Sequence, residues 1–240
     1  MPPRHTPSPA STARASAHIA RVDPAFAPLI RTVGPFDPRP PDPDPFSSLV
    51  RSIVFQQLAG SAARAIHGRF LALYDGQPTP AAILRTPVED LRAAGLSMNK
   101  ASSILDLALK TADGTLALDH VEDLGDAEIV QRLSTVRGIG RWTAEMFLLF
   151  QLRRPDVWPV DDLGVRKGYA RVHGLPAAPT PKALEALGEV YRPFRSAAAW
   201  YCWRAVDTVL PTSSPDLDTM PPTSPPVVAA DPPPSSPRGT

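Results

Sequence analysis

Two glycines flank one aliphatic residue at Gly138-Ile139-Gly140, where one expected helix ends and another begins. Glycine at both positions permits a positive φ and leaves no β-carbon in the way of a ligand. The backbone amides after such a turn point out of the N-terminus of the second helix, where the helix dipole favours an anion. The segment predicts a phosphate-binding hairpin made of backbone. The alternative is a corner whose glycines only let two helices pack closely.

The residues around the glycines favour the first interpretation. Leu133, Val136 and Ile139 have the spacing of an apolar plug beneath a helix-hairpin-helix turn, and Arg-Trp-Thr-Ala follows directly at residues 141–144. A lone Gly-x-Gly would favour close helix packing. The combination favours binding of the sugar-phosphate backbone of DNA.

These motifs resemble the helix-hairpin-helix DNA glycosylase superfamily. Residues 138–144 (GIGRWTA) and 156–165 (DVWPVDDLGV) are similar to it, and within it to the alkylpurine branch, the 3-methyladenine DNA glycosylase II type. Residues 52–58 (SIVFQQL) resemble that branch's upstream Gln-Gln segment, and residues 193–196 (PFRS) its late helix. The likeness runs from about residue 18 to residue 210 and implies an all-helical fold.

The resemblance implies that Asp162 is the catalytic residue. The family's catalytic aspartate begins the helix after the hairpin and has an aliphatic residue three positions later. Asp162 has Val165 at that spacing, whereas Asp161 has Gly164. An ionised carboxylate near the anomeric carbon stabilises the positive charge that develops on deoxyribose, and it can orient or deprotonate water. The alternative is that both aspartates only cap the helix beginning at Leu163.

Trp142 stands where bifunctional members of the superfamily carry a lysine that forms a Schiff base. An indole cannot form an imine, so we expect base release without strand cleavage. The single cysteine, Cys202, excludes the four-cysteine cluster of the endonuclease branch. An N3- or N7-alkylated purine already carries positive charge and leaves as a neutral base, so one carboxylate can suffice where sugar-ring glycosidases usually use two.

The resemblance also implies a pocket for an extruded base and a set of contacts to the duplex. The pocket residues would be Trp142, Trp203, Met146 and Phe55. Met146 stands where some members place an aromatic side chain, and Phe55 is either a compensating wall or core. The residues implied to contact DNA are Gly138, Gly140, Arg141, Thr143, Gln57, Leu58 and Lys100. Leu58 would enter the gap left by the extruded nucleotide; the alternative is that it belongs to the core.

In the family, carbonyl oxygens of the hairpin hold a monovalent cation that helps to neutralise phosphate. The resemblance implies that the carbonyls of Ser134, Val136 and Ile139 are its ligands, and it implies no other cofactor. The histidines have no acidic or cysteine partner at ligand spacing, which argues against a zinc site.

Charge and composition narrow the partners. The chain has 240 residues, 25 Lys and Arg against 24 Asp and Glu, and a net charge of +1. Such a balance argues against binding by bulk positive charge, so a polyanion must be held by local geometry. No stretch approaches the roughly 18 consecutive apolar residues of a membrane-spanning helix. We expect a monomer that acts on double-stranded DNA containing damaged bases and has no membrane partner.

Apolar residues spaced three and four apart from Phe46 to about Leu210 predict an all-α domain. Proline marks its limits, because 12 of the 31 prolines fall in residues 1–45 and 10 in residues 211–240. We predict disordered tails at 1–15 and 211–240, a helical glycosylase domain at 16–210 with its hairpin at about 133–144, and no N-terminal β domain. Helices are expected at about 17–33, 47–58, 62–74, 87–95, 97–111, 126–133, 146–152, 165–172, 181–191 and 194–210. Thr86 to Glu89 has the pattern of a capping box.

The sequence therefore predicts a monofunctional DNA glycosylase that releases alkylated purines, such as 3-methyladenine and 7-methylguanine, after base flipping, as in base excision repair. Two alternatives stay open: a non-catalytic, structure-specific DNA-binding module, and a glycosylase for neutral lesions such as hypoxanthine or ethenoadenine. We expect the protein in the cytoplasm or nucleoid of a bacterium or the nucleus of a eukaryote. Residues 1–15 superficially suit an organelle transit peptide but lack a clear apolar face.

Overall fold

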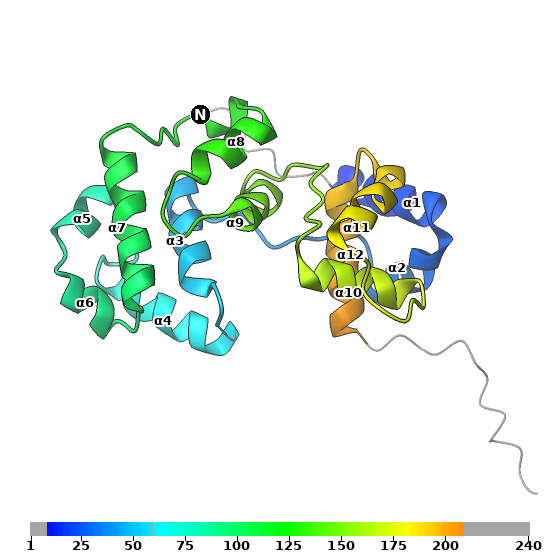
Figure 1. Ribbon diagram of the computed structural model, residues 1–240, viewed down its shortest axis with the longest axis horizontal. Helices are drawn as coiled ribbons and strands as arrows, with labels where there is room; N and C mark the ends of the chain where they lie inside the picture. The colour runs from blue at the N-terminus through cyan, green and yellow to red at the C-terminus, as the bar shows by residue number, and fades with distance from the viewer. Residues whose placement is uncertain (1–8, 59, 209–240) are drawn as a thin grey trace, which may run out of the picture. The chain divides into compact units, whose positions relative to one another are not determined.

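The computed structural model describes residues 9–58 and 60–208, and in this part of the chain every regular element is a helix, as predicted (Figure 1). Residues 1–8 and 211–240, where we predict disordered tails, lie outside the described residues. None of the described helices is long and apolar enough to cross a membrane. The helices are α1 (Pro9–Val22), η1 (Pro24–Phe26), α2 (Ala27–Val33), α3 (Pro45–Phe55), α4 (Gly60–Ala72), α5 (Pro80–Arg85), α6 (Val88–Ala93), α7 (Met98–Ala112), η2 (Val121–Asp123), α8 (Asp126–Leu133), α9 (Arg141–Met146), the π-helical η3 (Phe147–Gln151), α10 (Leu163–Val172), α11 (Pro181–Leu187), η4 (Glu189–Tyr191) and α12 (Arg195–Asp207).

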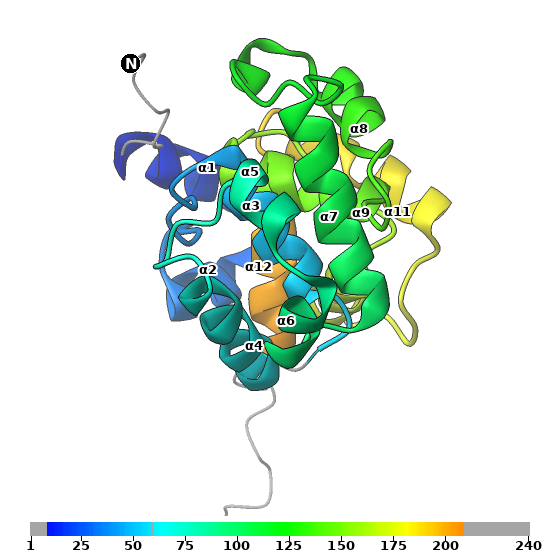
Figure 2. The ribbon, with the colours of Figure 1, turned by 90° about the vertical axis from the view of Figure 1, so that its left-hand side faces the viewer.

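Two helices organise the packing. α7 contacts α3, α5 and α6, which lie around it in the view of Figure 2. The contact between α10 and α12 is the most extensive between any two of the described helices. α12 also packs on α1 and α2. The hairpin between α8 and α9 is hydrogen-bonded to α7, whereas the candidate catalytic aspartate, Asp162, directly precedes α10.

The close approach of α10 to α12 depends on a glycine. A β-carbon at Gly168 would lie 1.9 Å from the carbonyl oxygen of Cys202. Real side chains cannot occupy that space, so only glycine lets the two backbones meet. Cys202 is buried, and burial raises the pKa of its thiol.

The N-terminal boundary of the helical part differs from the prediction. α1 begins at Pro9, so residues 9–15, which we assigned to a disordered tail, are helical. The helix is fixed by tertiary contacts that composition does not reveal: Ile19 is buried, and the Ser16 hydroxyl accepts hydrogen bonds from the Phe36 amide (2.8 Å) and the Tyr201 hydroxyl (2.8 Å). The helix expected at 17–33 is also interrupted, because Asp23 is extended (φ −143°) and caps a new turn at Pro24.

The predicted capping box at Thr86 is wrong. Thr86 ends α5, a helix that the sequence analysis missed, and its hydroxyl donates to the Ala82 carbonyl (3.0 Å). The next helix, α6, has Pro87 as its N-cap and receives no side-chain capping bond. The helix expected from about residue 97 is confirmed as α7, and Ser97 caps it, since its hydroxyl accepts a hydrogen bond from the Lys100 amide (3.3 Å).

The glycine contact between α10 and α12 predicts a large stability effect. We expect Gly168→Ala to lower the free energy of unfolding by about 3 kcal/mol or more, because the new methyl group forces two helix backbones apart. Gly68→Ala is the matched control: Gly68 lies within α4 with no atom within 4 Å of its added β-carbon. That change should stabilise the protein by about 0.5–1 kcal/mol. Urea unfolding of both variants checks this, and equal effects would contradict the packing argument.

Candidate active site

The turn between α8 and α9 contains the two glycines, and they serve different purposes. Gly138 has φ +74°, and a β-carbon there would lie 2.5 Å from the Ser103 hydroxyl oxygen. Gly140 has φ −99°, so only Gly138 uses the positive φ that glycine permits. No atom lies within 4 Å of a β-carbon built at Gly140, which leaves its outer side open to a ligand. Gly138 is thus needed for the turn itself, whereas Gly140 keeps the space beside it clear.

Side chains of α7 form hydrogen bonds to the backbone of this turn. The Asp106 carboxylate accepts hydrogen bonds from the Arg137 amide (2.7 Å) and from Lys110 Nζ (2.8 Å). Lys110 Nζ also donates to the Thr135 carbonyl (2.6 Å). Burial alone would raise the pKa of Asp106, but the hydrogen bonds from Arg137 and Lys110 lower it overall. The hairpin is therefore fixed by an ion pair that the sequence analysis did not identify.

The Asp162 carboxylate accepts hydrogen bonds from three N–H donors. Asp162 is the N-cap of α10, and its Oδ1 accepts from the Val165 amide at 2.8 Å. Oδ1 also accepts from Trp203 Nε1 (2.9 Å), and Oδ2 accepts from Trp142 Nε1 (2.6 Å). All three partners are donors, which suits an ionised carboxylate because it can only accept. The capping role and the expected site role thus fall on one residue, and Asp161 does not cap the helix.

An aromatic cleft adjoins this site through Gly164 and Trp203, but neither Asp162 nor Trp142 lines it. Trp203 stacks on Phe150, with ring centroids 5.6 Å apart and planes 27° apart, and Trp200 lines the same cleft. A β-carbon at Gly164 would lie 2.9 Å from Trp203 Cδ1 and 3.0 Å from Asp162 Oδ1, so Gly164 lets the indole reach the carboxylate. Phe150 was missed by the sequence analysis; its place one helical turn after Met146 was the available signal.

The four expected pocket residues are only partly brought together. Trp142 and Trp203 meet at Asp162, and the Trp142 side chain is 43% exposed. Met146 is half-buried on α9, and Phe55 is half-buried on α3 with the Arg51 guanidinium 4.3 Å from its ring centroid. Of these four residues, only Trp203 lines the cleft that it forms with Phe150. Their role in binding a base stays a prediction.

The end of α3 lies against the hairpin. Gln56 Nε2 donates to the Gly138 carbonyl (2.9 Å) and to the Thr143 hydroxyl (3.2 Å), an interaction that the sequence analysis missed. Thr143 is buried, so its hydroxyl contacts the Gln56 side chain rather than solvent. The next residues, Gln57 and Leu58, are exposed, and Gln57 has a left-handed backbone (φ +55°). The structure thus places the expected wedge residue at the surface, two residues after the glutamine that contacts the expected phosphate-binding turn.

Two expected DNA contacts also make internal bonds. Lys100 Nζ donates to the Val54 carbonyl (2.8 Å) and the Gln56 carbonyl (2.7 Å). Arg141 Nε donates to Glu145 Oε1 (2.9 Å), while most of the arginine side chain is exposed. Contact of either side chain with phosphate stays a prediction.

Glu145 is a buried carboxylate close to the site. Its residue exposure is 5%, and among the described residues Oε2 has no hydrogen-bond partner. Burial raises the pKa of Glu145, and the bond from Arg141 opposes that shift. The negative charges of Asp161 and Asp162 raise the pKa further, so Glu145 lies within electrostatic reach of the candidate catalytic group.

Among the described residues, two of the three carbonyls expected to hold a monovalent cation are free of hydrogen bonds, and binding of the cation stays a prediction. Within the described part of the chain, no hydrogen bond ends on the Ser134 or Ile139 carbonyl oxygen, and the Val136 carbonyl accepts one from the Ile139 amide (3.1 Å). Peptide oxygens without donors are suitable cation ligands. The described residues contain no cluster of three or more His, Cys, Asp or Glu side chains that could hold a metal ion.

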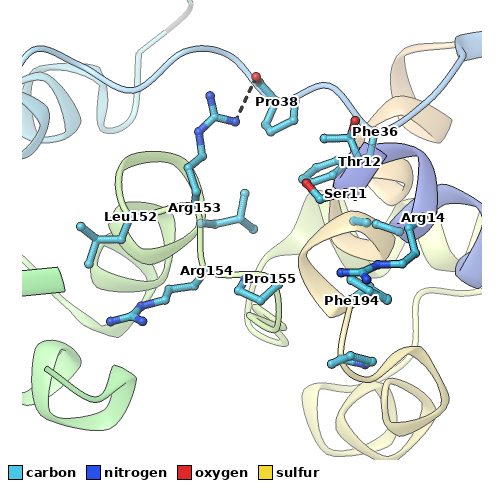
Figure 3. A pocket seen from close by; sticks show the side chains of 14 residues that line it. Ser11, Thr12, Arg14, Phe36, Pro38, Leu152, Arg153, Arg154, Pro155 and Phe194 are labelled. Carbon is cyan, nitrogen blue, oxygen red and sulfur yellow. Dashed lines mark hydrogen bonds between the residues drawn. The ribbon is translucent and has the colours of Figure 1, made fainter. Parts of the chain in front are cut away.

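A second cavity, of about 690 Å³, lies elsewhere, between α1 and the segments around residues 36–38, 149–155 and 193–197 (Figure 3). Its lining contains three arginines and no carboxylate. Arg153 donates to the Pro38 carbonyl (3.2 Å), as Figure 3 shows, and to the Arg39 carbonyl (2.6 Å). None of the expected site residues lines this cavity, so the candidate site remains the Asp162 carboxylate with the two tryptophans bonded to it.

Comparison with known proteins agrees with the geometry. The family model for HhH-GPD superfamily base excision DNA repair proteins matches residues 50–193, which is more than half of the chain. The chain belongs to this superfamily. The matched segment includes the hairpin, Trp142 and Asp162, and the resemblance of the sequence motifs to this superfamily is thereby confirmed.

Individual relatives in the HhH-GPD superfamily cover most of the chain. The Schizosaccharomyces pombe protein named DNA-3-methyladenine glycosylase 1 is 39% identical over 199 residues, which are 81% of this chain and 87% of that protein. A solved structure of the S. pombe 3-methyladenine DNA glycosylase in complex with abasic DNA has a TM-score of 0.77 and 38% identity, and it covers 83% of this chain and 99% of that one. The DNA-3-methyladenine glycosidase from Bacillus halodurans has a TM-score of 0.72 and 34% identity, over 81% and 89% of the two chains.

The two hairpin glycines predict opposite outcomes for the same substitution. Gly138→Ala should lower the free energy of unfolding by about 1–3 kcal/mol, because it combines a left-handed φ with a clash against Ser103. Gly140→Ala should cost less than about 1 kcal/mol. If DNA approaches the open side of Gly140, that variant should still lose DNA affinity. Thermal unfolding and a duplex-binding titration test both expectations, and a folded Gly138→Ala protein of wild-type stability would contradict them.

Burial of Glu145 predicts a pH dependence of stability. A carboxylic acid with a raised pKa binds more protons in the folded state than in the unfolded state. The free energy of unfolding therefore falls as the pH rises from the pKa of the unfolded state to the pKa of the folded state. Glu145→Gln removes this contribution and retains an oxygen that can accept from Arg141. The stability of the variant relative to wild type should therefore rise as the pH increases above about 4.3, the ordinary pKa of glutamate. Urea unfolding across that range measures the difference, and a constant or falling difference would refute the assignment.

Proposed function

We propose that this protein is a monofunctional DNA glycosylase that hydrolyses the N-glycosidic bond of alkylated purines, such as 3-methyladenine and 7-methylguanine, in double-stranded DNA. The observation that carries the proposal is the Asp162 carboxylate, which accepts hydrogen bonds from the indole N–H groups of the exposed Trp142 and of Trp203, which lines an aromatic cleft. The relatives named DNA-3-methyladenine glycosylase support the same reaction.

The geometry of Asp162 suits electrostatic stabilisation of a sugar cation. As the base leaves with the bonding electrons, positive charge develops on the deoxyribose, and a fixed negative charge nearby lowers the energy of that state. The carboxylate is held by donors on α9, α10 and α12, so it does not have to reorganise when the charge develops.

One oxygen of the carboxylate is better suited than the other to handle water. Oδ1 already accepts two hydrogen bonds, from Val165 and Trp203, whereas Oδ2 accepts one, from Trp142. A carboxylate oxygen has two lone-pair positions, so Oδ2 retains one for an O–H donor. We assign Oδ2 to orient the water whose oxygen bonds to the anomeric carbon and to accept its proton.

The aromatic residues give a modest preference for a cationic base. A positively charged purine on a tryptophan face gains roughly 0.5–2 kcal/mol over a neutral one. Trp142 offers an exposed side chain for this, while Trp203 is supported by Phe150. Selectivity should therefore come mainly from the weakened glycosidic bond and the easier extrusion of damaged bases. With an indole and no amine at position 142, the reaction ends at the abasic site.

Binding of the duplex is assigned to the hairpin and the end of α3. Within the described residues, no side chain caps the N-terminus of α9, whose first residue follows the open Gly140. Arg141 adds an exposed guanidinium, and Leu58 adds an exposed apolar side chain to fill the gap in the stack. A single chain supplies all of these parts, which supports action as a monomer.

Replacement of the two adjacent aspartates tests the proposal. Asp162→Asn should retain DNA binding but lower the single-turnover rate of base release by about a hundredfold or more, because it removes the fixed negative charge. Asp161→Asn is the control and should stay within a few-fold of wild type. Release is measured on methylated duplex by heating in alkali to reveal abasic sites. Undiminished release by Asp162→Asn would remove this residue from the mechanism.

The same assay separates the alternative functions. Wild-type protein that binds the methylated duplex without creating abasic sites would be a DNA-binding module. Faster release of hypoxanthine than of 7-methylguanine would identify an enzyme for neutral lesions. We expect 7-methylguanine to be released faster, because it leaves as a neutral base without prior protonation.

A further inference from the structure

We propose that Lys100 is a positioning residue for the corner formed by Gln57 and Leu58, and that it acts on DNA through this corner rather than by binding a phosphate. The inference rests on the proposed function, because the corner matters only if the protein opens a duplex. It assigns to Lys100 a role different from the phosphate contact expected from the sequence.

The ammonium group of Lys100 closes the end of α3. It donates to the carbonyls of Val54 and Gln56 at 2.8 and 2.7 Å. The last carbonyls of a helix have no partner within the helix, and a lysine ammonium can satisfy them. Two of its three N–H donors are thus used, and a move to a phosphate would leave both carbonyls unpaired.

The position of Lys100 in its own helix is electrostatically unfavourable. It lies in the first turn of α7, where the helix dipole disfavours a cation. The side chain is half-buried, and burial lowers its pKa. The negative end of the α3 dipole offsets both effects. This is consistent with a lysine whose role is to cap the C-terminus of α3.

Gln56 connects the two parts of the DNA-binding surface. Its backbone carbonyl is held by Lys100, and its side-chain amide donates to the Gly138 carbonyl and the Thr143 hydroxyl. The next residue, Gln57, turns the chain with φ +55°, a conformation that is uncommon for a residue other than glycine. Leu58 follows with 38% exposure. Lys100 therefore fixes the direction in which the chain leaves α3 and the distance between Leu58 and the hairpin.

The test compares Lys100→Met with Lys182→Met, which removes the same charge from the exposed surface of α11. The probe is a duplex with a tetrahydrofuran abasic analogue and 2-aminopurine beside it. Binding is measured across a salt series, and 2-aminopurine fluorescence reports insertion of the corner. Single-turnover release is measured on methylated duplex. Lys100→Arg is the conservative variant, and Lys100→Gln replaces Lys100→Met if circular dichroism shows that the latter is unfolded.

We expect Lys100→Met to leave the slope of log K against log salt equal to that of Lys182→Met. The fluorescence change and the release rate should both fall at least tenfold, and Lys100→Arg should recover most of each. In a Leu58→Ala background the same substitution should have little further effect, because both residues act through one corner.

Three results would overturn the inference. If the salt slope of Lys100→Met is smaller than that of Lys182→Met by about one and the fluorescence response is unchanged, Lys100 is a phosphate ligand. An unchanged release rate and fluorescence response would remove any role for it, and a full tenfold loss in the Leu58→Ala background would show that it acts elsewhere. If wild type releases no base but Lys100→Met still weakens the fluorescence response, the proposed function fails and the role of Lys100 stands.

Discussion

The structure depends on the hydrogen bonds that converge on the Asp162 carboxylate. Their donors come from three helices: Trp142 on α9, Val165 on α10 and Trp203 on α12. A negative charge that is partly withdrawn from water is stable only where donors compensate it. The same donors fix the direction of the charge, so one set of contacts both stabilises the site and prepares it for chemistry.

The rest of the fold can be understood as the means of bringing these helices together. Gly168 allows α10 to touch the backbone of α12, and Gly164 allows the Trp203 indole to reach the carboxylate. The loop that leads to Asp162 is tied to α12 by Arg195, whose Nε donates to Asp156 Oδ1 at 2.8 Å. On the other side, α7 holds the hairpin through Asp106 and Lys110. The position of α9, and with it Trp142, follows from that support.

Much of this arrangement was predictable from the sequence, because it depends on local sequence patterns. Spacing of apolar residues gave the helical class, and the hairpin glycines with Asp162 pointed to the superfamily. The contacts that join distant segments were not predictable in this way. Nothing in the neighbourhood of Gln56 signals its bond to Gly138, and nothing near Lys100 shows that its ammonium ends another helix. The helix at residues 9–15 was missed for the same reason, since its stability comes from packing against α12 and the segment around Phe36.

The central claim is that the Asp162 carboxylate stabilises positive charge on the sugar of an extruded nucleotide. Its most direct test is the affinity for a duplex in which a cationic pyrrolidine replaces the deoxyribose, compared with the neutral tetrahydrofuran analogue. Wild type should bind the pyrrolidine duplex at least a hundredfold more tightly, and Asp162→Asn should lose most of that difference while binding the neutral duplex as before. Equal preference for the cation in both proteins would contradict the account.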